Sequence, residues 1–150
     1  MGAEFDFRKV MGARHRVIHV GTGNWLSFPV IHHVFHQHLT HTLRDAAMAD
    51  GILEAALLVT YEGRYRPDQT PYEPWLDFQR GKVGRGLAAM AANPPAAEPL
   101  TVAGIGLACA LEYIDFREQY DWRPEFPALV AWLDAFNATH PAFAESKPSA

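Results

Sequence analysis

The sequence predicts an all-α protein, a bundle of about four to five helices that follows a His-rich N-terminal segment of poor structure. Helix start signals recur at threonines along the chain: Thr42, Thr70 and Thr101 each precede a segment with apolar residues at helical spacing. Proline-containing stretches separate these segments. A chain of 150 residues, 49% of them hydrophobic, is long enough for one domain with a buried core.

The stretch 100–111 is almost free of polar side chains and predicts the central helix of the bundle. Thr101 is a good N-cap, because its hydroxyl can accept a hydrogen bond from a backbone N–H one turn later. Leu100 and Ile105 have the spacing of a hydrophobic staple around this cap. A helix that is apolar on all sides should be buried, so we expect Cys109 to be a small buried hydrophobic residue rather than a nucleophile.

The other helices are predicted from their caps and their apolar faces. A capping box at 42–45 opens a helix from Leu43 to about Arg64. Thr70 as N-cap and a proline at the first helical position open a second helix, which ends near Ala92. A last helix begins at Pro124 or Pro127, ends at residues 137–140, and can be followed by one turn around residues 141–145.

Composition changes near residue 41, which divides the chain into a His-rich leader at 1–41 and a helical domain at 42–150. Seven of the eight histidines lie between His15 and His41. Residues 16–20 favour a short strand, whereas 29–36 fit a strand or a helix equally well. A disordered leader and a truncated or frame-displaced gene would both produce such a change in composition.

The histidines are the only metal-like pattern in the sequence. The pairs His15/His19 and His32/His36 are spaced by four residues, and neutral imidazoles bind zinc, nickel and copper. No cysteine or carboxylate completes a ligand set, so we expect no metal site.

Several classes of protein are disfavoured by composition. The net charge of −4 gives no basic surface for nucleic acid, and no apolar run reaches the length of a membrane span. The first residues lack the apolar block of a secretory signal, and a single cysteine allows no intramolecular disulfide. We therefore expect a cytoplasmic protein that binds neither nucleic acid nor membrane.

Four stretches in order resemble the C-terminal helical domain of bacterial glutathione S-transferases, and together they span residues 42–148. The apolar stretch 100–111 resembles that domain's central helix, and 49–56 and 75–87 resemble its first two helices. The stretch 127–133, followed by Pro141 and Phe143, resembles the late helix and the terminal turn of the domain.

The resemblance implies glutathione as co-substrate, an apolar electrophile as second substrate, no separate cofactor and a homo-oligomer. Family members activate the glutathione thiol in a thioredoxin-like domain that precedes the helices. Residues 1–41 are too short for that domain, so no residue of this chain is expected to be catalytic. Two classes of function follow: a transferase when such a domain completes it, or a non-catalytic helical module for interaction or dimerisation. An apolar docking face is expected on 43–64 and near Trp122.

Three tyrosines are candidate walls of a pocket for the electrophile. Tyr61, Tyr65 and Tyr113 lie on the two predicted helices that face the domain cleft in this family. The alternative is that they are ordinary half-buried aromatics whose hydroxyls reach water. Asp115 and Arg117 are expected in a solvated ion pair.

Gly104 stands where the family has an aspartate that closes a capping box onto Thr101. On the sequence alone, Gly104→Asp should stabilise the fold by about 1–2 kcal/mol, since it restores the cap and removes a helical glycine.

Overall fold

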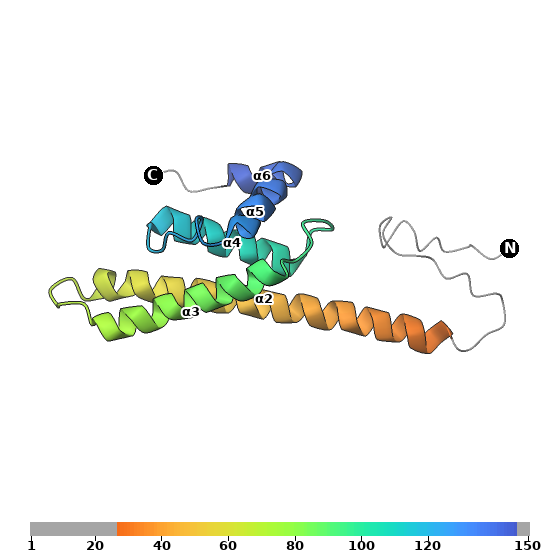
Figure 1. The fold of residues 1–150 in the computed structure, drawn as a ribbon, viewed down its shortest axis with the longest axis horizontal. Helices are drawn as coiled ribbons and strands as arrows, with labels where there is room; N and C mark the ends of the chain where they lie inside the picture. Colours follow the sequence, from red (N-terminus) through yellow and green to blue (C-terminus); the bar gives the residue numbers. More distant parts are fainter. Residues whose placement is uncertain (1–26, 147–150) are drawn as a thin grey trace. The chain divides into compact units, whose positions relative to one another are not determined.

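The computed structural model describes residues 27–146, which fold as helices joined by loops (Figure 1). The helices are α2 (Ser27–Tyr65), α3 (Glu73–Ala92), α4 (Val102–Arg117), α5 (Pro127–Thr139) and α6 (Pro141–Glu145). The predicted all-α class is confirmed for this part of the chain, and the last turn after Pro141 is present. The strand predicted at 16–20 lies outside the described residues.

Helix α2 begins well before the predicted start at Leu43, so the capping box at 42–45 is wrong. The Thr42 hydroxyl donates to the carbonyl oxygen of His38 at 2.9 Å, inside the helix. A threonine can make this contact in any helical turn, and the sequence signature does not distinguish it from a cap. The stretch 29–36, left open between strand and helix, is helical. Residues from Gln37 onwards form a compact unit.

Helix α3 begins at Glu73 with Tyr72 as N-cap, rather than with the predicted cap at Thr70, and it ends at Ala92 as predicted. The backbone N–H of Tyr72 donates to a carboxylate oxygen of Glu62 at 3.4 Å. A carboxylate from the end of α2 therefore serves the start of α3, a pairing that local sequence cannot reveal. The helices α2 and α3 run side by side as an antiparallel hairpin (Figure 1).

Helix α4 begins as its sequence indicates, with the Thr101 hydroxyl accepting a hydrogen bond from the backbone N–H of Gly104 at 3.1 Å. One face of α4 is buried in the core, which also takes residues from every described helix except α6. The opposite face is open: an apolar stripe, defined by Val102, Ile105, Cys109 and Phe116, is exposed. The expectation that Cys109 is buried is therefore wrong, because no described element covers this side of the helix.

Gly104 lies against the aromatic cluster of α5, which reverses the effect expected from its capping position. A Cβ at this glycine would lie 3.2 Å from Cε2 of Phe136. That ring is fully buried and packs on Trp132, His140 and Phe143, with centroid separations of 5.1, 4.7 and 5.3 Å. A ring held on three sides cannot move aside at low cost.

We now expect Gly104→Asp to destabilise the domain by roughly 1 kcal/mol, because overpacking costs more than a restored cap returns. Thermal and urea unfolding of the full chain measures this change. The same substitution in a Phe136→Leu background should stabilise, since the smaller side chain makes room for the carboxylate. Equal effects in the two backgrounds would contradict the packing explanation.

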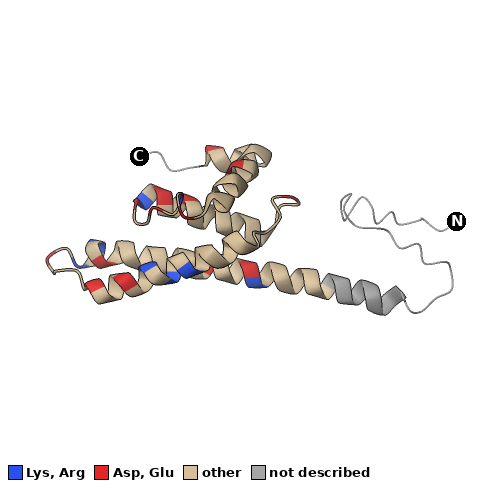
Figure 2. Ribbon diagram, in the orientation of Figure 1, with Lys and Arg blue, Asp and Glu red and all other residues tan. Residues whose placement is uncertain are grey.

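Charged residues lie from Arg44 onwards on α2, between Glu73 and Arg85 on α3, and only in the second half of α4 (Figure 2). Among the described helices, none combines the length and apolar character needed to cross a membrane.

Candidate functional site

A chain of hydrogen bonds ties the second half of α4 to α2 through Tyr113, one of the predicted substrate-wall residues. The Tyr113 hydroxyl and the Thr60 hydroxyl are 2.9 Å apart. The Thr60 hydroxyl also contacts the Gln119 side chain, whose amide nitrogen can donate to the carbonyl oxygen of Ala56 at 2.8 Å. With the Gln119 amide in this orientation, the direction of both hydrogen bonds is set: the Tyr113 hydroxyl donates to Thr60, and the Thr60 hydroxyl donates to the Gln119 side-chain oxygen. The Tyr113 ring is therefore held in place by its hydroxyl.

The other two predicted wall residues lie one helical turn apart on α2. Tyr61 and Tyr65 pack edge to face with ring centroids 4.9 Å apart; Tyr61 is half-buried and Tyr65 is exposed. In the contacts of the described residues, neither tyrosine joins the hydrogen bonds of Tyr113. A role for the three tyrosines as a substrate wall stays a prediction.

A cation lies beside the Tyr113 ring. The Arg117 guanidinium carbon is 5.6 Å from the centroid of Tyr113 and 4.7 Å from that of Phe116. The ion pair expected between Arg117 and Asp115 is wrong. Asp115 instead pairs with Arg123 at 2.6 Å and accepts from the indole N–H of Trp122 at 2.7 Å.

The one cysteine in the sequence, Cys109, is not set up as a reactive thiol. Although Cys109 is exposed, partial loss of hydration on α4 raises the pKa of its thiol, and the nearby Glu112 carboxylate adds to this rise. A raised pKa leaves the thiol protonated at neutral pH, whereas the thiolate is the reactive form. Within residues 27–146, no three histidine, cysteine, aspartate or glutamate side chains are grouped as metal ligands.

A second candidate site, which the sequence did not predict, lies between the end of α2 and the start of α3. We call it the α2–α3 groove; it has a volume of about 610 Å³ and is lined by Glu62, Arg66, Tyr72, Pro74, Trp75 and Phe78. Trp75 and Phe78 stack with centroids 6.0 Å apart. Their spacing of three residues was the available signal, but such spacing equally fits a buried helix face.

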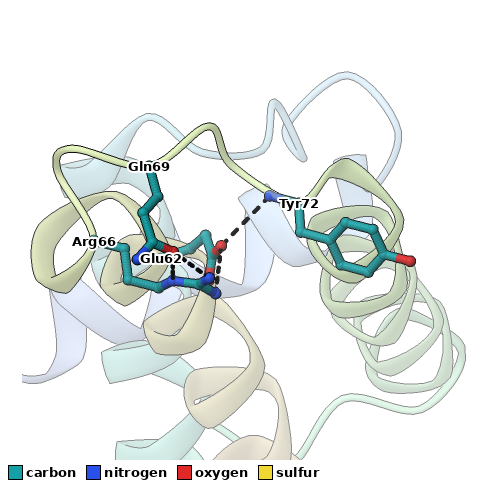
Figure 3. Close-up of polar contacts among 4 residues, drawn as sticks. All are labelled: Glu62, Arg66, Gln69 and Tyr72. Atoms are coloured by element: carbon teal, nitrogen blue, oxygen red, sulfur yellow. Dashed lines mark hydrogen bonds and ion pairs between the residues drawn. The ribbon is translucent and has the colours of Figure 1, made fainter.

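Polar contacts fix one side of the α2–α3 groove (Figure 3). The Arg66 guanidinium donates through Nε to the Gln69 side-chain oxygen at 2.7 Å, and through Nη1 to Glu62 at 3.2 Å. Glu62 also accepts from the backbone N–H of Tyr72. One carboxylate thus joins the last turn of α2 to the first turn of α3.

Residues 73–135 match the family model of the glutathione S-transferase C-terminal domain. A glutathione transferase family member from Pseudomonas fluorescens Pf-5 is 39% identical in two structures, each matching 73% of this chain. One holds S-(propanoic acid)-glutathione, with a TM-score of 0.66; the other holds glutathione, with a TM-score of 0.67. A glutathione S-transferase from Methylobacterium radiotolerans in complex with glutathione sulfonate is 32% identical over 73% of this chain, with a TM-score of 0.61.

A comparison with curated proteins gave no match. The matches to the solved structures span 57%, 55% and 53% of those longer chains. The family model covers α3, α4 and most of α5, so sequence and fold agree over the core of the bundle. The chain therefore belongs to the glutathione S-transferase family, of which it carries the C-terminal helical domain.

Proposed function

We propose that the helical domain of this chain forms the electrophile-binding half of a glutathione S-transferase, with glutathione held by a thioredoxin-like domain. The observation that carries the proposal is the 39% identity to a transferase family member with bound S-(propanoic acid)-glutathione, a glutathione bearing an S-substituent. The fixed ring of Tyr113 supports it, because a wall for a second substrate has to keep its shape.

The proposed reaction is attack of the glutathione thiolate on an electrophile. The thioredoxin-like domain would lower the pKa of the thiol, and the helical domain would hold the electrophile near it. Such positioning contributes by making the encounter effectively intramolecular. Tyr113 would contact the apolar part of the electrophile, while Arg117 beside its ring would favour an electron-rich or negatively charged substituent.

We expect the 150-residue chain alone to show no conjugation of glutathione to chlorodinitrobenzene above the uncatalysed rate, because the proposal places activation of the thiol in the thioredoxin-like domain and not in these helices. A fusion of the thioredoxin-like domain of a glutathione S-transferase to this chain should conjugate. In that fusion, Tyr113→Ala should raise the KM for the electrophile and leave the KM for glutathione unchanged. The absorbance of the conjugate measures all three, and Leu43→Ala, on exposed surface, is the matched control.

A second function, a non-catalytic interaction module, is favoured by the apolar stripe on α4. Exposed apolar surface of this kind marks an interaction face. The fusion experiment separates the two functions. A fusion that folds, binds glutathione and turns over no electrophile would contradict the transferase proposal, and self-association of the native chain through the stripe would then support the module.

A further inference from the structure

We propose that the α2–α3 groove is a binding site for a neutral, planar aromatic small molecule, separate from the wall at Tyr113. The inference goes beyond the transferase function and does not depend on it. None of Tyr61, Tyr65 and Tyr113 lines this groove.

The groove has the size and the apolar lining that a small aromatic ligand requires. It is an open surface groove of about 610 Å³, so a small aromatic molecule could lie along its lining with one side facing solvent. Tyr72, Trp75 and Phe78 are 63%, 40% and 56% exposed, so aromatic surface faces solvent on one side of the groove. A planar ring placed against Trp75 and Phe78 would continue the stack that these two side chains have already formed.

The charges in the groove favour a neutral occupant over an ionic one. The Glu62 side chain is only 9% exposed, and its negative charge is opposed by Arg66 at 3.2 Å. Arg66 in turn donates to both Glu62 and Gln69, which hold its guanidinium in place. A bound anion would compete with Glu62 for this guanidinium, and a bound cation would compete with Arg66 for the carboxylate. Remaining N–H groups of Arg66 can still donate to an uncharged acceptor on the ligand.

The same contacts make the site preformed. Glu62 ties α2 to the backbone of Tyr72, and Pro74 follows in the first turn of α3, so the aromatic wall is anchored at its base. A site ordered before binding loses less conformational entropy when a ligand arrives. The backbone at the start of α3 is therefore anchored, and Trp75 and Phe78 support each other by stacking.

The test uses the full chain and phenylnaphthylamine, a neutral fluorescent probe, beside anilinonaphthalene sulfonate, which has the same rings and a negative charge. Phenylnaphthylamine should bind with a Kd on the order of 10–100 μM. Trp75→Ala should weaken it by about tenfold or more, and Phe78→Ala should also weaken it, since each removes part of the stack. Trp75→Phe should retain binding. Leu43→Ala, which changes an exposed apolar residue of α2 outside the groove, should match the native chain.

Circular dichroism first establishes that each variant folds, which is expected because Trp75 and Phe78 are exposed. Unchanged binding in both Trp75→Ala and Phe78→Ala would overturn the proposal. If the sulfonate bound more tightly than the neutral probe, and this preference were lost in Arg66→Gln, the assignment of a neutral ligand to the groove would be wrong. The proposal would also be overturned if the probe bound neither the native chain nor Trp75→Ala, while sedimentation showed that the native chain self-associates and Trp75→Ala does not. That result would assign the groove to a second copy of the chain.

Discussion

Replacing Trp122 by alanine is expected to lower the free energy of unfolding by about 3–5 kcal/mol, the usual cost of removing a large buried aromatic side chain. The side chain is fully buried, and its indole N–H donates to Asp115 at 2.7 Å. Arg123 lies over the same ring, 4.8 Å from its centroid, and pairs with Asp115. Trp122, in the loop after α4, therefore contributes both to the buried core and to the polar contacts with Asp115 and Arg123.

Urea unfolding followed by circular dichroism measures this loss. Trp75→Ala is the matched control, because it removes the same side chain from an exposed position and should change the free energy of unfolding by less than about 1 kcal/mol. Trp122→Phe should fall between the two, since it keeps most of the ring volume and loses the hydrogen bond. A similar loss for Trp75→Ala and Trp122→Ala would contradict the burial assigned to Trp122. Trp122 itself is buried, so it does not belong to the apolar docking face that the sequence predicted near it.

Replacing Gly86 by leucine is expected to destabilise the domain by about 3 kcal/mol, the upper end of the usual range for overpacking. At this glycine α3 lies close against α2. A Cβ placed on it would overlap Cγ1 of Ile52 and lie 3.0 Å from its Cδ1, and Ile52 is itself buried. A larger side chain must push the two helices apart or force Ile52 out of its rotamer.

Gly51→Leu is the control for this prediction, because nothing lies within 4 Å of a Cβ at Gly51. That change should stabilise α2 by about 0.5–1 kcal/mol through helix propensity alone. The double variant Gly86→Leu/Ile52→Ala should recover most of the loss, since the volume added on α3 is removed from α2. Thermal unfolding of Gly86→Leu, Ile52→Ala, the double variant and Gly51→Leu gives the change in stability of each, and from these the coupling energy between positions 86 and 52. Strictly additive effects of Gly86→Leu and Ile52→Ala would refute the close helix approach.

The sequence correctly predicted features that depend on residues close together in the chain. The cap at Thr101 is one, because its hydroxyl contacts an N–H only three residues away. The end of α3 at Ala92 follows from the asparagine after it, and α5 starts at Pro127, one of the two prolines that the sequence left open. Local chemistry decides these positions, and the order of the helices made the family resemblance visible over most of the chain.

The same local rules gave wrong results at Thr42 and at Thr70, where the sequence signature fits more than one structure. Thr42 and Asp45 match a capping box, yet Thr42 bonds within a continuous helix. Thr70 matches an N-cap, but Glu62 takes the N–H of Tyr72 and α3 starts later. Each signature fits both a helix N-terminus and another position in or near a helix, and the local sequence does not distinguish the two.

The sequence by itself determined the helical class, the family and the identity of the central helix, because these depend on composition, periodicity and adjacent residues. Only the tertiary structure decided which faces are covered. It buried Trp122, exposed Cys109, set Phe136 against Gly104 and assembled the α2–α3 groove from residues on two helices. The physical reason is that burial and ring contacts depend on which elements pack together, and the pattern along one helix does not specify its neighbour.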